Sequence, residues 1–147
     1  MSVTIDRIDG RTSGRWQAFL LAAAFPLFLG ALWSDYGYWT SYELQWSNFA
    51  SWLVFGGMVF LGIALVFSIA GLFRATRRGG RSLAYFGLLL AAFVLGFVNA
   101  LVHARDAYAV MPAGLVLSLL VAVLVAVATW IAFSGLGYAG MRAEARP

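Results

Sequence analysis

Apolar residues fall in four long blocks separated by short polar stretches. The blocks cover about residues 16–33, 49–73, 83–103 and 113–138. A helix needs about 20 apolar residues to cross a hydrocarbon core about 30 Å thick, and each block is close to that length. A helix also satisfies its own backbone hydrogen bonds inside a bilayer. The pattern therefore predicts an all-α fold, an integral membrane bundle of four antiparallel helices.

Little of the chain lies outside these blocks. Residues 1–15 form an N-terminal segment, residues 16–140 the four-helix transmembrane domain, and residues 141–147 a tail. The composition agrees, because 63% of the residues are hydrophobic and 11% are charged, whereas a soluble domain has about 25% charged residues. The absence of cysteine excludes disulfides and thiolate metal sites.

Arginine is distributed unevenly between the segments that connect the blocks. The N-terminal segment has three, the tail has two, and the other two loops share only Arg105. The loop between the second and third blocks has four, which are Arg74, Arg77, Arg78 and Arg81. Since arginine in short loops marks the cytoplasmic side, we expect both termini in the cytoplasm, in a bacterial inner membrane. The net charge of +4 is explained by topology and predicts no nucleic-acid partner.

Small residues at spacings of three or four indicate which faces of the helices pack together. Close backbone approach stabilises helix pairs in lipid. The expected packing residues are Ala18, Ala22, Pro26 and Gly30 in the first block, Ala92 and Gly96 in the third, and Ser118, Ala122 and Ala126 in the fourth.

The predicted spans contain no Asp, Glu, Lys or Arg. Ionisable groups inside a membrane commonly mark proton and ion pathways, so their absence argues against a transporter. No metal-ligand spacing, phosphate loop, catalytic triad or carboxylate pair is found, and we therefore expect no enzymatic activity.

His103 is the only histidine, and Asn99 lies one helical turn before it. One interpretation is an axial ligand for haem iron, with Met111 or a partner completing the coordination, or a hydrogen-bond donor to a quinone. The other is a structural histidine at the outer interface, bonded to Asn99 or to Asp106. We favour the structural interpretation, because polar interfacial residues commonly hold helices together.

The expected periplasmic loop, residues 34–48, and its flanks are rich in aromatic residues. They include Trp33, Tyr36, Tyr38, Trp39, Tyr42, Trp46 and Trp52, with Asp35 and Glu43 as the only charges. Trp and Tyr favour the headgroup region, so an aromatic belt is one explanation. The alternative is a docking surface for another protein, since the same residues dominate interface hot spots.

The chain resembles the domain of unknown function 2231 family of bacterial four-span membrane proteins. The resemblance rests on Phe25-Pro26, on the segment NALVHARD from Asn99 to Asp106, and on Gly114, Ser118, Trp130 and Tyr138. It implies a four-helix membrane fold and an association with membrane electron-transfer systems. Relatives often carry histidines near the first span, whereas Phe19 to Ala24 contain none, so a haem-binding role would rest on His103 alone.

These features give three hypotheses for function. The first is a non-catalytic small subunit without a cofactor that packs into a larger inner-membrane complex, respiratory or electron-transfer, with lipid and other subunits or a second copy as partners. The alternative is a small b-type cytochrome, holding haem b, or a quinone-interacting protein that uses His103. The third is a small channel or carrier, which would need a polar route through the bundle.

Overall fold

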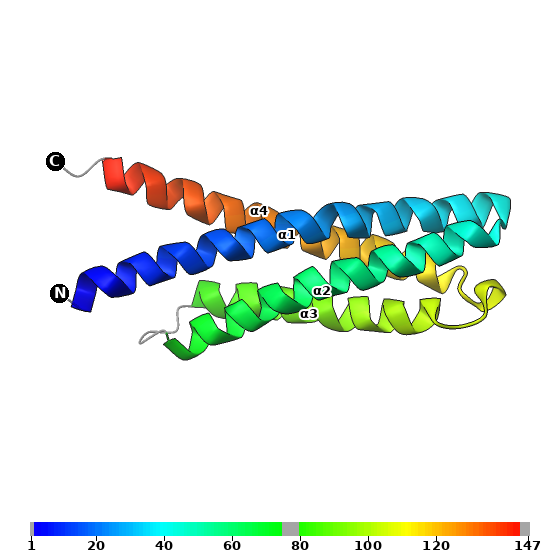
Figure 1. Ribbon diagram of the computed structural model, residues 1–147, viewed down its shortest axis with the longest axis horizontal. Helices are drawn as coiled ribbons and strands as arrows, with labels where there is room; N and C mark the ends of the chain where they lie inside the picture. The colour runs from blue at the N-terminus through cyan, green and yellow to red at the C-terminus, as the bar shows by residue number, and fades with distance from the viewer. Residues whose placement is uncertain (1, 75–79, 145–147) are drawn as a thin grey trace.

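Four long helices make up almost all of the protein in the computed structural model, which describes residues 2–74 and 80–144. They are α1 (Ser2–Ser41), α2 (Leu44–Arg74), α3 (Gly80–His103) and α4 (Ala113–Glu144), with a short 3-10 helix, η1 (Ala107–Ala109), before α4. The described residues contain no strand. Successive helices run in opposite directions (Figure 1). The predicted all-α, four-helix architecture is confirmed.

Each helix contains a segment long and apolar enough to cross a membrane. These segments are Gly14–Ser41, Leu44–Phe73, Ser82–His103 and Ala113–Gly135. The shortest has 22 residues, which at 1.5 Å per residue span about 33 Å. That length matches the hydrocarbon core of a bilayer. The chain is therefore a multi-pass integral membrane protein.

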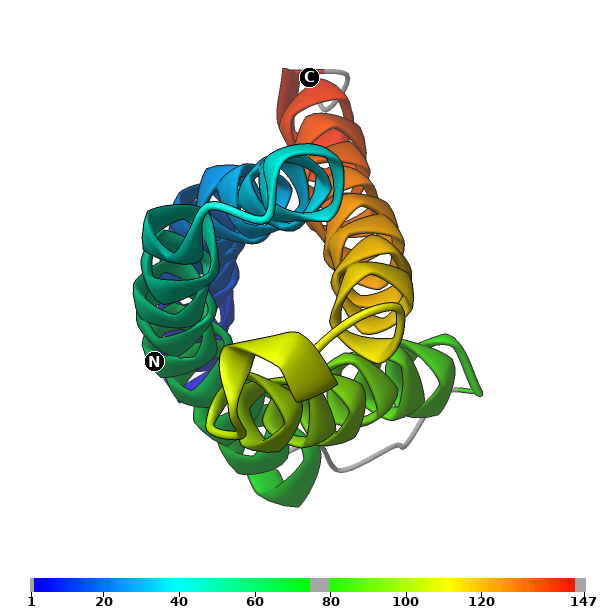
Figure 2. The ribbon, with the colours of Figure 1, turned by 90° about the vertical axis from the view of Figure 1, so that its right-hand side faces the viewer.

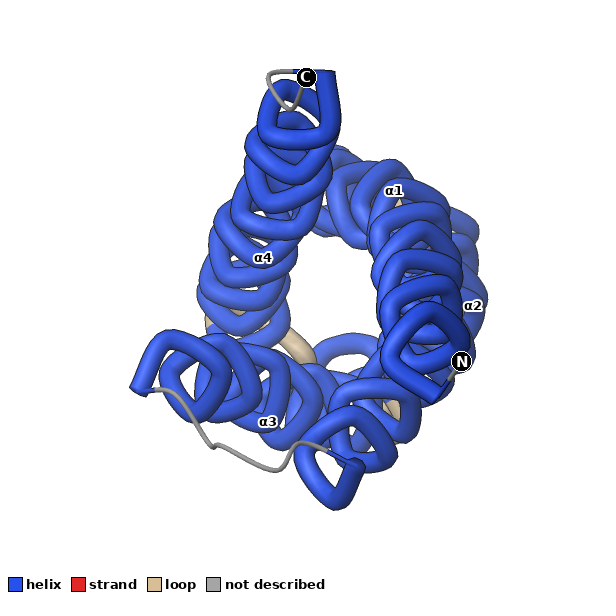
Figure 3. The backbone as a smooth tube through the Cα atoms, turned by 90° about the vertical axis from the view of Figure 1, so that its left-hand side faces the viewer, coloured by secondary structure: helices blue, strands red, loops and turns tan. Residues whose placement is uncertain are grey.

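The four helices form a ring in which each packs against the next and α4 closes against α1 (Figure 2). Consequently α1 and α3 face each other across the centre. Seen from the opposite end, α4 leans away from the ring toward its C-terminus (Figure 3). The start of α1 and the end of α4 lie at one end of the bundle, and the α1–α2 turn and the α3–α4 connection at the other (Figure 1). We call this second end the loop end.

The middle of the bundle is filled by apolar side chains from all four helices. Fully buried examples are Leu21, Ala24, Phe28, Leu61, Leu89, Val121 and Val125. The core depends on glycine where two helices approach closely. A Cβ atom on Gly57 of α2 would lie 2.9 Å from Cε2 of Phe28, closer than side chains tolerate. Gly57 therefore makes room for the largest apolar ring in the centre of the core.

The prediction of a loop over residues 34–48 is wrong, because α1 continues to Ser41 and α2 begins at Leu44. Polar residues remain helical here because their hydroxyls bond carbonyls one turn back, as Ser34 Oγ does to the oxygen of Gly30 (2.8 Å) and Ser41 Oγ to that of Gly37 (2.7 Å). The turn consists of two residues, and Tyr42 reverses the chain with φ of 55°. Asp35 is consequently a helical residue.

The expected packing residues are buried on α3 and, except for Ala126, on α4, whereas on α1 only Ala18 is buried. Ala92, Gly96, Ser118 and Ala122 are buried, and Gly30 and Ala126 are half-buried. Ala22 and Pro26, by contrast, are exposed, so the expected packing face does not pass through them. The buried face of α1 instead follows Ala18, Leu21, Ala24, Phe28, Ala31, Asp35 and Tyr38.

Two of the arginines expected to set topology, Arg77 and Arg78, lie outside the described residues. The side chains of Arg74 and Arg81 are not described either.

Candidate functional site

Four polar side chains from three helices are buried together near the loop end. Asp35 on α1, Asn99 and His103 on α3, and Ser118 on α4 are 0%, 0%, 7% and 1% exposed. We call them the polar cluster. They connect α1 to α3 across the centre of the ring and connect both helices to α4. Polar contacts of this kind hold membrane helices together.

The polar cluster is a closed ring of hydrogen bonds. Asn99 Nδ2 donates to Ser118 Oγ (3.0 Å), and Ser118 Oγ donates to Asp35 Oδ2 (2.5 Å). The other carboxyl oxygen, Asp35 Oδ1, lies 2.8 Å from His103 Nε2. The ring closes where His103 Nδ1 lies 3.0 Å from the main-chain oxygen of Asn99. Each member thus positions the next.

The acceptors around His103 determine where its protons lie. A main-chain carbonyl oxygen only accepts, so Nδ1 of His103 must carry a proton. The short contact between Nε2 and Asp35 Oδ1 then holds one further proton, bound to the imidazole or to the carboxyl. Either placement leaves the pair neutral as a whole. An Asp and a His can therefore be buried here without an uncompensated charge.

Neighbouring residues fit closely around the imidazole. A Cβ atom on Gly114, in the first turn of α4, would lie 3.2 Å from Cε1 of His103 and 2.6 Å from Cγ1 of Val110. Val110 itself is fully buried. The backbone of α4 therefore packs directly against the histidine ring, and glycine at this position allows it.

The polar cluster lies near one boundary of the hydrocarbon core. Asp35 follows Arg15 by 20 residues on α1, which corresponds to about 30 Å, the thickness of the core. Six further residues separate Asp35 from the end of α1 at Ser41, or about 9 Å. The α1–α2 turn and the α3–α4 connection therefore lie beyond the cluster at the loop end.

The prediction that the spans contain no Asp, Glu, Lys or Arg is wrong. Asp35 lies in the first span, Gly14–Ser41, and is fully buried. The sequence also predicted that His103 would bond Asn99 or Asp106. It bonds the main chain of Asn99, but its acidic partner is Asp35. The absence of ionisable residues from the spans can therefore no longer be used as an argument against a proton or ion pathway.

The geometry disfavours two kinds of chemistry. Ser118 donates to Asp35 and has no hydrogen bond to His103, so the three do not have the order of a serine nucleophile, its base and an orienting acid. Both ring nitrogens of His103 are already engaged, so coordination of haem iron would require breaking a buried contact. Within the described residues, no group of three or more His, Cys, Asp or Glu side chains could hold a metal ion.

Three buried polar atoms have no hydrogen-bond partner among the described residues: Tyr38 Oη, Tyr85 Oη and Asn99 Oδ1. Asn99 belongs to the polar cluster, and Tyr38 lies one turn beyond Asp35 toward the loop end. Tyr38 is 1% exposed, and its ionisable neighbours are Tyr42, Asp106 and Tyr108. Tyr85 lies on α3 near the opposite end of the bundle. Buried polar atoms without a partner are rare and call for an explanation.

Most of the aromatic residues expected to bind a partner are exposed. Trp33, Tyr36, Trp39, Tyr42, Trp46 and Trp52 lie on α1, α2 and the turn between them, and each is at least 39% exposed. Tyr38 is the exception, because it is buried and cannot belong to a surface. At the loop end, α3 and α4 carry no Trp or Tyr, and their connection contributes only Tyr108. At the loop end, the exposed Trp and Tyr side chains therefore lie mainly on α1, α2 and the turn between them.

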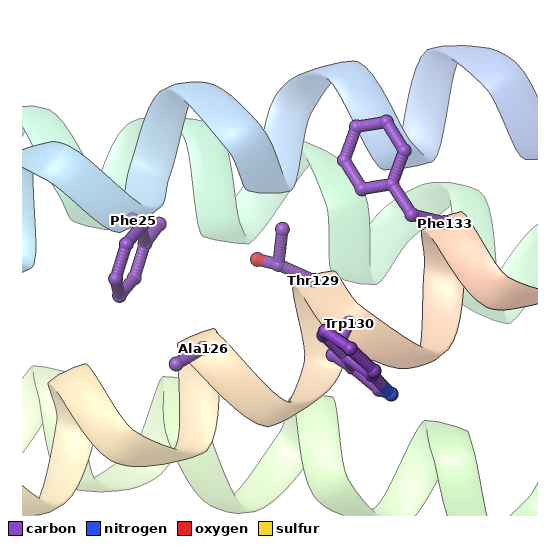
Figure 4. Close-up of a pocket in the computed structure, with 5 residues that line it drawn as sticks. All are labelled: Phe25, Ala126, Thr129, Trp130 and Phe133. Carbon is purple, nitrogen blue, oxygen red and sulfur yellow. The ribbon is translucent and has the colours of Figure 1, made fainter.

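An open apolar groove of about 430 Å³ lies between α1 and α4 (Figure 4). Phe25 lines it from α1, and Ala126, Thr129, Trp130 and Phe133 line it from α4. Thr129 lies 11 residues from Ser118 on the same helix, or about 16 Å along its axis. The groove is therefore separate from the polar cluster.

Comparison with known proteins adds nothing to these observations: no protein-family model, no curated protein and no solved structure matches this chain. The resemblance to the domain of unknown function 2231 family stays a prediction.

Proposed function

We propose that this chain is a non-catalytic subunit of a larger membrane complex, and that it docks against another membrane protein through the exposed aromatics of α1 and α2. This aromatic face consists of Trp33, Tyr36, Trp39, Tyr42, Trp46 and Trp52. A complex for electron transfer is the class that the family resemblance would suggest.

One observation supports docking over a lipid belt, namely the uneven distribution of Trp and Tyr. Lipid headgroups surround a free protein on every side, so a belt would be expected on all four helices. Instead, six exposed Trp and Tyr side chains lie on the α1–α2 side of the loop end, whereas the α3–α4 side has only Tyr108. Trp and Tyr bury large areas at a small entropic cost, which suits them to an interface.

The proposed orientation places the loop end outside the cytoplasm. Residues 1–15, 74–82 and 141–147 carry nine of the ten arginines, and Arg105 is the only one at the loop end. Such an imbalance favours cytoplasmic termini and a periplasmic aromatic face, in a bacterial inner membrane.

Site-specific photocrosslinking in native membranes tests the proposal. A photoreactive amino acid replaces Trp33 or Trp52, which are 72% and 67% exposed, and in the control it replaces Trp130 on α4, which is 78% exposed. We expect adducts to a different membrane protein from Trp33 and Trp52 and none from Trp130. The purified complex should also be heavier than one copy of the chain.

Two outcomes would contradict the proposal. Equal crosslinking from all three positions would mean that the aromatic face has no special partner. Adducts made only of two copies of this chain would show self-association in place of a complex.

A further inference from the structure

The polar cluster has a second complete arrangement of hydrogen bonds, which contains one more proton. In the observed arrangement the amide of Asn99 donates to Ser118, and Asn99 Oδ1 has no partner. If that amide turned over, Oδ1 would face Ser118 Oγ and accept its hydrogen bond. Ser118 could then accept from Asp35 Oδ2, which requires a protonated carboxyl. Each bond between these three side chains would reverse its direction, and none would be lost.

In this second arrangement His103 donates from both ring nitrogens. Nδ1 still donates to the carbonyl of Asn99, and Nε2 donates to Asp35 Oδ1. Asp35 is a neutral acid and His103 an imidazolium, so the cluster has one positive charge in place of none. The residues that would satisfy this state are already within hydrogen-bond distance of one another.

We propose that the polar cluster is a binding site for one additional proton, which reaches it from the loop end past Tyr38. The reaction is the transfer of a proton from hydronium in the aqueous phase to the Asp35–His103 pair, with release of water. The inference does not depend on the proposed docking function, since it concerns only the interior of the bundle.

Access from the loop end follows from what lies on either side of the cluster. Toward the opposite end, the next core residues include Ala31, Phe28, Val54 and Val121, which are apolar and fully buried. They offer no group that could carry a proton. Toward the loop end lies Tyr38, whose buried hydroxyl has no partner. Tyr38 lies three residues beyond Asp35 on the same helix, and a hydroxyl both donates and accepts, so we assign it the role of relay between loop-end water and the cluster.

The charged and titratable groups around this route are few. Besides Asp35 and His103, α1 contributes Tyr38, and the α1–α2 turn contributes Tyr42 and Glu43. The α3–α4 connection contributes Arg105, Asp106 and Tyr108. Within their membrane-spanning parts, α2 (44–73) and α4 (113–135) contribute none. Asp106 is one of the ionisable neighbours of Tyr38, and its negative charge favours entry of a proton over entry of an anion.

Infrared difference spectroscopy of the full chain in lipid nanodiscs tests the proposal. Lowering the pH from about 8 to about 2 covers the ordinary titration ranges of His and Asp. We expect a carbonyl band from one buried protonated carboxyl to appear in the wild type and to be missing in Asp35→Asn. The near-ultraviolet circular dichroism should not change over the same range, because the helices stay packed. A wild type without the band, or a band retained in Asp35→Asn, would overturn the proposal.

The route is tested by the rate at which the band appears after a pH jump. Tyr38→Phe removes the proposed relay and should lower the rate at which the band appears by about a hundredfold, which is in the range of the contribution of a positioned proton-transfer group. Tyr85→Phe is the matched control, since its buried hydroxyl also lacks a partner but lies near the other end; it should leave the rate within about twofold. Equal slowing by both variants, or by neither, would refute access past Tyr38. A band that appears only as the circular dichroism collapses would mean that an opened bundle takes up the proton.

Discussion

Replacing Asp35 by alanine should destabilise the bundle far more than replacing it by asparagine. Alanine removes the acceptor of Ser118 Oγ and the partner of His103 Nε2, and both groups stay buried. Asparagine restores both bonds. Its Oδ1 accepts from Ser118, and its Nδ2 donates to Nε2 of a neutral imidazole that keeps its proton on Nδ1.

The expected size of the effect follows from the number of groups left without a partner. A buried polar group without a hydrogen bond costs about 1–3 kcal/mol, so two groups give about 2–6 kcal/mol. Hydrogen bonds between membrane helices average only about 0.6 kcal/mol, with a maximum near 1.7, so two give about 1–3 kcal/mol. We expect a loss of about 2–3 kcal/mol for Asp35→Ala, where the two ranges overlap, and about 1 kcal/mol or less for Asp35→Asn.

Reversible unfolding in mixed detergent micelles measures these differences, with tryptophan fluorescence and circular dichroism as readouts. An unfolding free energy of Asp35→Ala within about 0.5 kcal/mol of the wild-type value, the range of ordinary surface substitutions, would show that the polar cluster contributes little to packing. If Asp35→Asn were as damaging as Asp35→Ala, the assignment of a single shared proton to Asp35 and His103 would be refuted.

Three further predictions concern packing and ligation. Gly114→Ala should destabilise the fold by about 1–3 kcal/mol through overpacking, because its Cβ would press on Val110 and His103. The control Gly71→Ala, with open space around it, should not destabilise the fold. Equal effects of the two substitutions in unfolding assays would refute the close contact. Pro26→Ala should not destabilise the fold, because the proline is exposed and the substitution restores a helical N–H donor; a loss above about 1 kcal/mol in the same assay would contradict this. Added haemin should give no absorption spectrum that depends on His103, since both ring nitrogens are engaged; a low-spin spectrum lost in His103→Ala would contradict this.

The sequence was sufficient for the four helices because long apolar blocks have few other solutions in lipid. It was less informative about which face of each helix is buried. On α1, a strict spacing of four was followed from Ala18 through Ala22 to Pro26. Each step of four residues turns about 40° past a full helical turn, and Ala22 and Pro26 are both already exposed. The residues actually buried are spaced by three or four residues, more often by three.

Asp35 was missed because hydropathy ended the first span at Trp33. The helix continues past it, since the hydroxyl of Ser34 bonds within the helix and Asp35 has partners on other helices. A signal was available: Asp35 continues the buried spacing of Phe28 and Ala31. Its pairing with His103 joins residues 68 positions apart, and a single sequence has no local pattern that reveals such a contact.

The contact between Asp35 and His103 across the bundle underlies both the packing of the polar cluster and its proposed proton binding. Solid-state NMR in lipid bilayers tests it directly, because His103 is the only histidine and a histidine label therefore reports one site. With ¹⁵N in the imidazole and ¹³C in the aspartate carboxyls, Nε2 should show a strong dipolar coupling to one carboxyl carbon, and Asp35→Asn should abolish it. An Nε2 without such a coupling, or with one that survives in Asp35→Asn, would contradict the account.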